Sequence, residues 1–133
     1  MRAILYSILV VLSSAFCVSC DDNLVEITFF NNSKGAAYFT CVVSDDPSYV
    51  IKSKDFGSKN YFIKVEPSER LSFSKDEEQV SCEKIHFLVI KSTTMDKYDD
   101  KSFREAEDIC DKRFVFTYNE LKKKGFIIEF KNN

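Results

Sequence analysis

The stretch KIHFLVIK, residues 84–91, decides the fold of this chain. Between its two lysines lie six residues in a row that are all apolar except His86. An unbroken apolar run of this length is typical of a strand covered on both faces, because an exposed face would need alternating polar residues. We therefore expect residues 84–91 to form the central strand of the domain.

Two alternating stretches upstream predict a hairpin. Residues 24–31 carry apolar side chains at every second position, and so do residues 36–44. Such alternation is typical of strands that bury one face. The polar sequence at 31–35, Asn-Asn-Ser-Lys-Gly, supplies a turn between them. Pro47 ends the second strand because proline lacks the backbone donor that a central strand needs.

A second hairpin is predicted around a proline turn. Residues 61–65 and 71–73 alternate, and Glu-Pro-Ser-Glu at 66–69 lies between them. Proline presets the φ angle that such a turn requires. The neighbouring segments 49–60 and 74–81 are polar and charged, so we expect both to be exposed connections.

Two short helices are predicted near the C-terminus. Ser102 is expected to cap a helix that runs to about Cys110, with apolar residues at helical spacing on one face. Thr117 and Glu120 have the spacing of a capping box and predict another short helix. Gly125 supplies the left-handed residue that ends it.

Residues 113–117 and 126–130 complete a set of seven predicted strands. Short strands separated by turns indicate a mainly β domain, a two-layer antiparallel β-sandwich of immunoglobulin-like or transthyretin-like type. The alternative is an α+β fold, in which residues 85–117 form a right-handed crossover with one parallel strand pair.

The N-terminus carries a separate signal. An apolar run follows Arg2 and ends in Cys17-Val-Ser-Cys20. The run is short for a membrane-spanning helix and is typical of a secretory signal. It resembles the signal peptide of bacterial lipoproteins, in which the cysteine of the lipobox is acylated, as with palmitate, and becomes the first residue. The resemblance implies that Cys20 is the lipidated residue.

The predicted organisation is a signal peptide at 1–19, a lipidated tether at 20–23 and a single β-rich domain at 24–131. Asp21 and Asp22 resemble the acidic start of Bacteroidetes-type lipoproteins bound for the outer membrane. We expect a protein of the cell envelope, held by lipid on the periplasmic face or the cell surface. An uncleaved membrane anchor and a secreted protein without lipid are the alternatives.

The C-terminal half also resembles small uncharacterised Bacteroidetes lipoproteins, which share an apolar strand, a helix and a closing strand. The positions that keep the pattern here are Lys97-Tyr98, Lys112-Arg113, Thr117, Leu121 and Ile128. The resemblance implies a location and a fold, and it carries no known activity.

The composition is that of a globular domain. The 133 residues include 13 Phe and 6 Tyr but only 3 Gly and 2 Pro, which is unlike a linker or a disordered tail. The formal net charge is -2, so no basic excess favours nucleic acid as a partner.

Three cysteines stay in the folded domain once Cys17 is removed and Cys20 is acylated. They are Cys41, Cys82 and Cys110. One disulfide with one free thiol is expected in an oxidising compartment, and burial of all three as free thiols is the alternative. Cys82 and Cys110 form the favoured pair if each precedes a strand at the same end of the sheet.

Cys82 and His86 are the candidates for a thiol nucleophile and its base, and with Cys41 and Cys110 they have the composition of a zinc site. The ligands are scattered, whereas structural zinc sites take paired ligands two to four residues apart. No glycine-rich oxyanion loop or orienting third group accompanies the thiol. We therefore expect no catalytic residue, no metal and no cofactor.

Tyr49 and Tyr98 lie in predicted loops and are candidate contacts for a partner. Lys122, Lys123 and Lys124 are interpreted as a solvated helix face. The expected function is that of a non-catalytic binding or assembly accessory module, which recognises an envelope protein or a glycan through loops or a free strand edge. The alternative is an inhibitor or immunity lipoprotein against a secreted toxin or protease.

Overall fold

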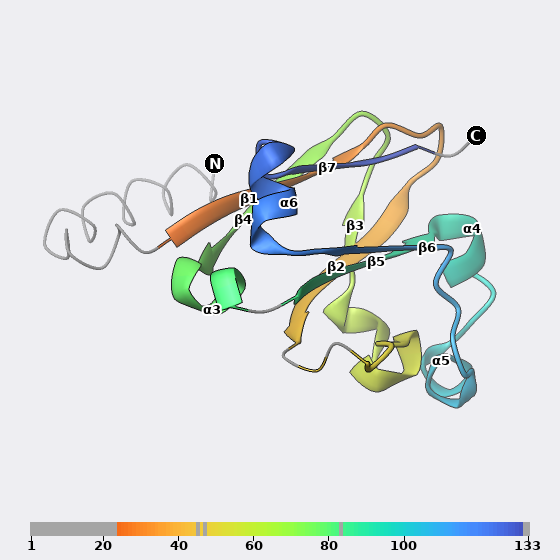
Figure 1. Ribbon diagram of the computed structural model, residues 1–133. Coiled ribbons are helices and arrows are strands. Elements are labelled where there is room, and N and C mark those ends of the chain that lie inside the picture. Colours follow the sequence, from red (N-terminus) through yellow and green to blue (C-terminus); the bar gives the residue numbers. More distant parts are fainter. Residues whose placement is uncertain (1–23, 45, 47, 83, 132–133) are drawn as a thin grey trace, which may run out of the picture.

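Seven strands in two sheets confirm the predicted mainly β sandwich (Figure 1). The computed structural model describes residues 24–44, 46, 48–82 and 84–131. The first sheet has three strands in the order β4-β1-β7, which are β4 (Arg70–Asp76), β1 (Leu24–Asn31) and β7 (Ile127–Phe130). The second sheet has four in the order β3-β2-β5-β6, which are β3 (Ile63–Val65), β2 (Ala37–Ser44), β5 (Lys84–Lys91) and β6 (Lys112–Phe116).

Strand β5 is central and covered on both faces, as its sequence predicts. It pairs with β2 on one side and β6 on the other, both antiparallel. Ile85, Phe87 and Val89 belong to the core between the two sheets. Leu88 and Ile90 belong to a second apolar cluster on the outer face of the same sheet. All residues from 85 to 90 are buried, so this strand joins the two cores.

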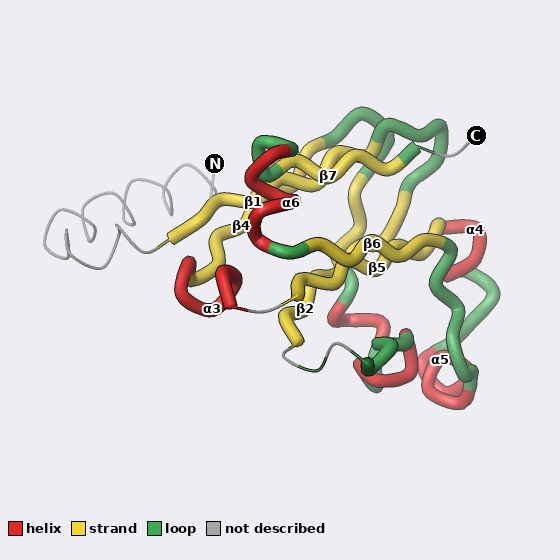
Figure 2. Tube along the Cα trace, viewed as in Figure 1, coloured by secondary structure: helices red, strands yellow, loops and turns green. Residues whose placement is uncertain are grey.

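The second cluster is covered by short helices and loops rather than by another sheet. Figure 2 shows helices α4 (Ser92–Met95) and α5 (Asp100–Glu105) on the side of the second sheet away from β7. Two 3-10 helices, η1 (Ser53–Phe56) and η2 (Lys59–Tyr61), lie beside them. The cluster they cover consists of Ile51, Phe62, Leu88, Ile90, Met95, Phe103 and Ile109.

The expectation that residues 49–60 form an exposed connection is therefore wrong. Ile51 and Ser53 are both buried. The Ser53 hydroxyl accepts a hydrogen bond of 2.9 Å from the backbone N–H of Ile109, which fixes this loop to the segment after α5. The apolar residues that anchor the loop are too widely spaced to form a periodic pattern.

Both predicted hairpins are also wrong, because each turn carries the chain from one sheet to the other. β1 pairs with β4 in the first sheet, whereas β2 pairs with β3 and β5 in the second. The segments 32–36 and 66–69 are therefore arches between sheets. β1 and β7 run parallel, and this is the one departure from antiparallel pairing among the described strands. β5 and β6 are antiparallel, which excludes the alternative crossover with a parallel pair.

Asn31 connects the two arches. Its side chain is fully buried, and its amide nitrogen donates to the carbonyls of Gly35 (3.0 Å) and Val65 (2.9 Å). Its backbone N–H donates to Glu69 O at 3.0 Å, and its carbonyl accepts from Ser68 N–H at 2.8 Å. A buried amide with all these bonds made holds the arches at a fixed distance from one another.

Helices α3 (Glu77–Cys82) and α6 (Tyr118–Lys123) bury Val80 and Leu121 in the core between the sheets. The expected solvated connection at 74–81 is therefore wrong, since β4 runs to Asp76 and α3 follows directly.

The capping box at the start of α6 is confirmed, because Thr117 Oγ1 accepts from Glu120 N–H at 3.3 Å. Gly125 has the expected left-handed conformation, with φ of 67°. The preceding helix, α5, begins after Asp99 rather than at Ser102 and ends at Glu105. No helix among the described residues is long and apolar enough to cross a membrane.

We predict that Asn31→Ala lowers the free energy of unfolding by about 2–4 kcal/mol, because it leaves two buried carbonyls without a donor. Urea denaturation followed by circular dichroism measures this. Asn119→Ala, at an exposed position of α6, is the matched control and is expected to change the stability by about 0.5 kcal/mol or less. Equal effects of the two substitutions would contradict the role given to Asn31.

Candidate functional site

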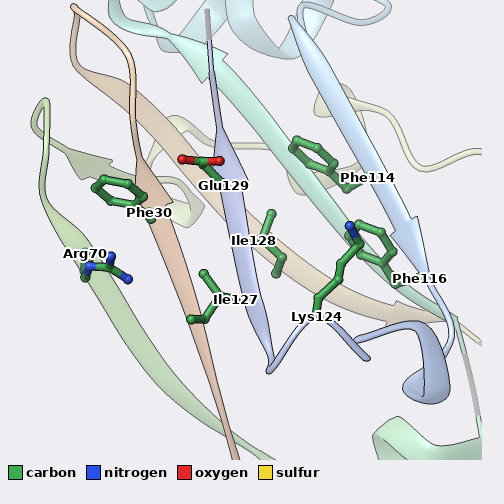
Figure 3. A pocket seen from close by; sticks show the side chains of 8 residues that line it. All are labelled: Phe30, Arg70, Phe114, Phe116, Lys124, Ile127, Ile128 and Glu129. Atoms are coloured by element: carbon green, nitrogen blue, oxygen red, sulfur yellow. The ribbon is translucent and has the colours of Figure 1, made fainter. Parts of the chain in front are cut away.

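The first sheet is one strand narrower than the second, and this leaves a groove along one side of the sandwich. β7 ends the three-stranded sheet, and β6 ends the four-stranded sheet. Between and around these edges lies a groove of about 690 Å³, within the range of ligand sites in proteins (Figure 3). It is lined by Phe30, Arg70, Phe114, Phe116, Lys124, Ile127, Ile128 and Glu129.

One wall of the groove is apolar. Phe114 and Phe116 lie two residues apart on β6, so both point towards the inside of the sandwich. Their rings are stacked with centroids 6.0 Å apart, and Phe116 contacts the core ring of Phe87. Both remain partly exposed, since no strand of the narrower sheet covers them. The wall is thus a part of the core face that is left open.

Three cations lie on aromatic rings at the groove. The Arg70 guanidinium carbon is 4.3 Å from the ring centroid of Phe30, and Lys124 Nζ is 5.4 Å from that of Phe116. Just beyond the lining residues, Lys112 Nζ lies 5.4 Å from the centroid of Phe114. Such pairs contribute about 0.5–1 kcal/mol each at exposed sites, and the ammonium and guanidinium donors stay available to a ligand.

The charge at the groove is mainly positive. Glu129 is the one carboxylate among the lining residues. It already forms an ion pair with Lys131 at 3.3 Å and accepts from Asn32 Nδ2 at 2.7 Å. In the described part of the chain, the three cations on the rings have no carboxylate within 4.0 Å. An anionic group is therefore the complementary ligand.

The edge of β7 offers free backbone groups to the groove. The carbonyls of Phe126 and Phe130 accept from β1 at 2.8 and 2.9 Å. Because backbone groups alternate in direction along a strand, the N–H and C=O of Ile127 and Glu129 point away from β1. Figure 3 shows β7 in the middle of the groove, with the rings of Phe114 and Phe116 on one side.

The two tyrosines predicted as partner contacts lie elsewhere. Tyr49 is 49% exposed, and a hydrogen bond with Asp55 raises the pKa of its hydroxyl. Tyr98 packs against the second cluster, and its carbonyl accepts from Lys59 Nζ at 2.5 Å. Neither tyrosine lines the groove, and their role as contacts stays a prediction. Cys20 lies outside the described residues.

The described cysteine side chains do not have the character of nucleophiles. Cys41 and Cys110 are free thiols, and burial raises the pKa of each to about 12. Both are therefore protonated at neutral pH, whereas the thiolate is the reactive form. Cys41 lines a smaller cavity of about 320 Å³ on the β3–β4 side of the sandwich, together with Phe39 and Leu71.

The condition for the Cys82–Cys110 pair is not met by the strand directions. α3 ends at Cys82 just before β5, and Cys110 comes just before β6. Since β5 and β6 are antiparallel, the starts of these strands lie at opposite ends of the sheet. Cys110 is a free thiol, and the side chain of Cys82 lies outside the described residues.

His86 is buried within β5, between Val42 on β2 and Val115 on β6. It is 6% exposed, and its Nε2 has no hydrogen-bond partner in the described structure. Burial, and to a smaller extent Lys84, lowers the pKa of the imidazole. The described residues contain no group of three or more His, Cys, Asp or Glu side chains placed to hold a metal.

The groove residues are ones that the sequence prediction missed. Phe30 offers the one local signal, because it stands in the outward register of β1, where Glu26 and Thr28 are polar. Arg70 and Lys124 carry no such signal, since each lies among other charged residues.

We predict that lowering the pH from 8 to 5 reduces the free energy of unfolding because of His86. A histidine whose pKa is lowered by folding stabilises the fold above its unfolded pKa, and this contribution is lost as the pH falls below it. His86 is the only histidine in the chain, and carboxylates titrate mostly below this range. Urea titrations across this range measure the effect.

His86→Leu is the matched variant, because it fills the buried site and cannot be protonated. Its free energy of unfolding is expected to change much less between pH 8 and 5. An equal slope for the variant and the natural chain would show that another group is responsible.

Comparison with protein families, curated proteins and solved structures found no match to this chain. We therefore infer its function from its own residues.

Proposed function

We propose that this chain is a lipid-anchored protein of the cell envelope whose folded domain is a non-catalytic binding module. Its partner is a protein that binds in the groove between β6 and β7. The observation that carries this proposal is the open edge of the narrower sheet, where an apolar wall, unpaired cations and free backbone groups meet.

The chemistry of the groove favours recognition over catalysis. Its lining residues include no cysteine, serine or histidine, and its one carboxylate is already paired with Lys131. General acid–base or nucleophilic catalysis needs a second group within hydrogen-bond reach of the first. Aromatic and basic residues around a free strand edge are instead the features with which proteins bind peptides.

The lipid on Cys20 is part of this proposal. Each buried methylene of an acyl chain contributes about 0.8 kcal/mol, and two or more chains make anchoring stable. A domain held in this way needs no membrane-binding face of its own. The groove is then free to bind a partner.

We predict that Cys20→Ser moves the protein from the membrane fraction to the soluble fraction of cells that process lipoproteins. Mass spectrometry of the natural protein should find Cys20 at the N-terminus, with the added mass of acyl chains. A mature chain that starts at Met1, or an unmodified Cys20, would contradict lipid anchoring and leave the groove to be tested separately.

We predict that a photo-cross-linking phenylalanine analogue at Phe116 captures one discrete envelope protein in intact cells that make the full-length chain. The same analogue at Lys101, an exposed residue of α5, is the matched control and should give no such product. Mass spectrometry of the product separates a resident envelope protein from a secreted toxin or protease. Identical products at both positions, or none at Phe116, would contradict binding in the groove.

A further inference from the structure

We infer that the groove accepts an extended segment of the partner, with alternating apolar and acidic residues, as a fourth strand of the β4-β1-β7 sheet. This inference rests on the proposed function and adds the chemistry of the bound segment. It depends on three independent features of the groove, which are its missing strand, its free backbone groups and its charge.

The groove has the position of a missing strand. Three strands face four, and the uncovered part of the wider sheet is the inner face of β6. A strand placed beside β7 would cover Phe114 and Phe116, as the strands of a sandwich cover the sheet opposite. Residues on both sides of β7 line the groove, so such a strand would have side chains on both faces in contact with the protein.

The backbone of β7 is prepared for this pairing. Ile127 and Glu129 each direct one donor and one acceptor away from β1. Their groups are the template that a free strand edge offers to an extended chain. The described strand is only four residues long, so the added strand would be short as well.

The side chains around the groove define the sequence that fits. Alternate residues of the added strand would face Phe114, Phe116 and Ile128, and apolar side chains suit these positions. The other residues would face the outer side of the sheet, where Arg70 lies on Phe30 (Figure 3). Carboxylates at these positions would pair with Arg70 and with the lysines at the rim.

Other occupants fit less well. A sugar that stacks on Phe30, Phe114 or Phe116 would have to displace the cation that lies on each ring. A second copy of this chain, paired edge to edge through β7, would bring two sets of unpaired cations together. Like charges in contact oppose association.

The probe is a fluorescein-labelled peptide in which Val and Glu alternate over ten residues, and its control has Lys in place of Glu. Fluorescence anisotropy with the lipid-free domain in detergent-free buffer would suffice only if that domain folds alone, so the full acylated chain in detergent is used. We expect the Val-Glu peptide to bind about tenfold or more tightly than the Val-Lys peptide, and its binding to weaken as salt is added. Equal binding of the two peptides, or no binding of either, would overturn the inference.

Substitutions of cations test the role of charge. Arg70→Gln combined with Lys124→Gln should weaken binding of the Val-Glu peptide about tenfold, because two of the pairing charges are lost. Lys123→Gln is the matched control, since Lys123 lies on the same helix as the neighbouring Lys122 and does not line the groove. An unchanged affinity of the double variant would overturn the role of charge.

Glu129→Pro tests strand addition. The N–H of Glu129 points to the groove, so proline removes a docking donor without removing a bond to β1, and edge strands tolerate proline in this orientation. Glu129→Ala is the matched control. We expect Glu129→Pro to abolish peptide binding and Glu129→Ala to retain or strengthen it. Equal binding by both variants would overturn strand addition.

Hydrogen exchange gives a second measurement that needs no substitution. The amides of Ile127 and Glu129 should become protected when the Val-Glu peptide binds, and unchanged exchange under saturation would overturn strand addition. If these tests fail while the cross-link at Phe116 persists, the protein still binds a partner in the groove, but not as an added strand. Loss of the cross-link as well would remove the proposed function itself.

Discussion

The buried amide of Asn31 is the interaction on which the arrangement of the two sheets depends. It stands at the end of β1, opposite Phe130 of β7, and bonds to both segments that cross between the sheets. Burial of an amide is costly unless its hydrogen bonds are made, so alternative positions of the arches leave polar groups unpaired. The fixed arches in turn fix the end of β1 against which β7 pairs.

The groove follows from this topology. The first arch takes the chain from β1 to β2, and the second takes it from β3 back to β4. After β5 and β6, helix α6 returns the chain to the first sheet, where β7 pairs parallel with β1. The left-handed residues Gly125 and Phe126 make this return possible within a few residues. Three strands therefore face four, and the face of β6 is left open.

The sequence predicts single strands well and their partners poorly. An apolar run identifies β5, and alternation identifies which residues of β1 and β2 are buried, because these patterns depend on one strand alone. The same alternation does not distinguish a hairpin from an arch, since both place two half-buried strands around a polar turn. Asn31 was a usable signal, because it continues the buried register of Val25, Ile27 and Phe29 with a polar residue.

The groove was harder to predict than the fold. Phe30, Arg70, Phe116 and Lys124 come from four separate segments, and only the pairing of β1 with β4 and β7 brings them together. The loop at 49–60 was missed for a related reason, since its buried residues are anchored by contacts with α5 and the segment after it. Both features depend on long-range contacts that leave no period in the sequence.

The position of the groove is compatible with a lipid on Cys20. Residues 20–23 span at most about 14 Å when extended, so a lipid anchor would hold the membrane near Leu24, at the start of β1. β7 pairs only with the second half of β1, from Thr28 to Asn31. At about 3.3–3.4 Å per residue, this half lies about 13–24 Å further along the strand. A membrane at the first end of β1 would therefore leave the groove at the other end accessible to a partner.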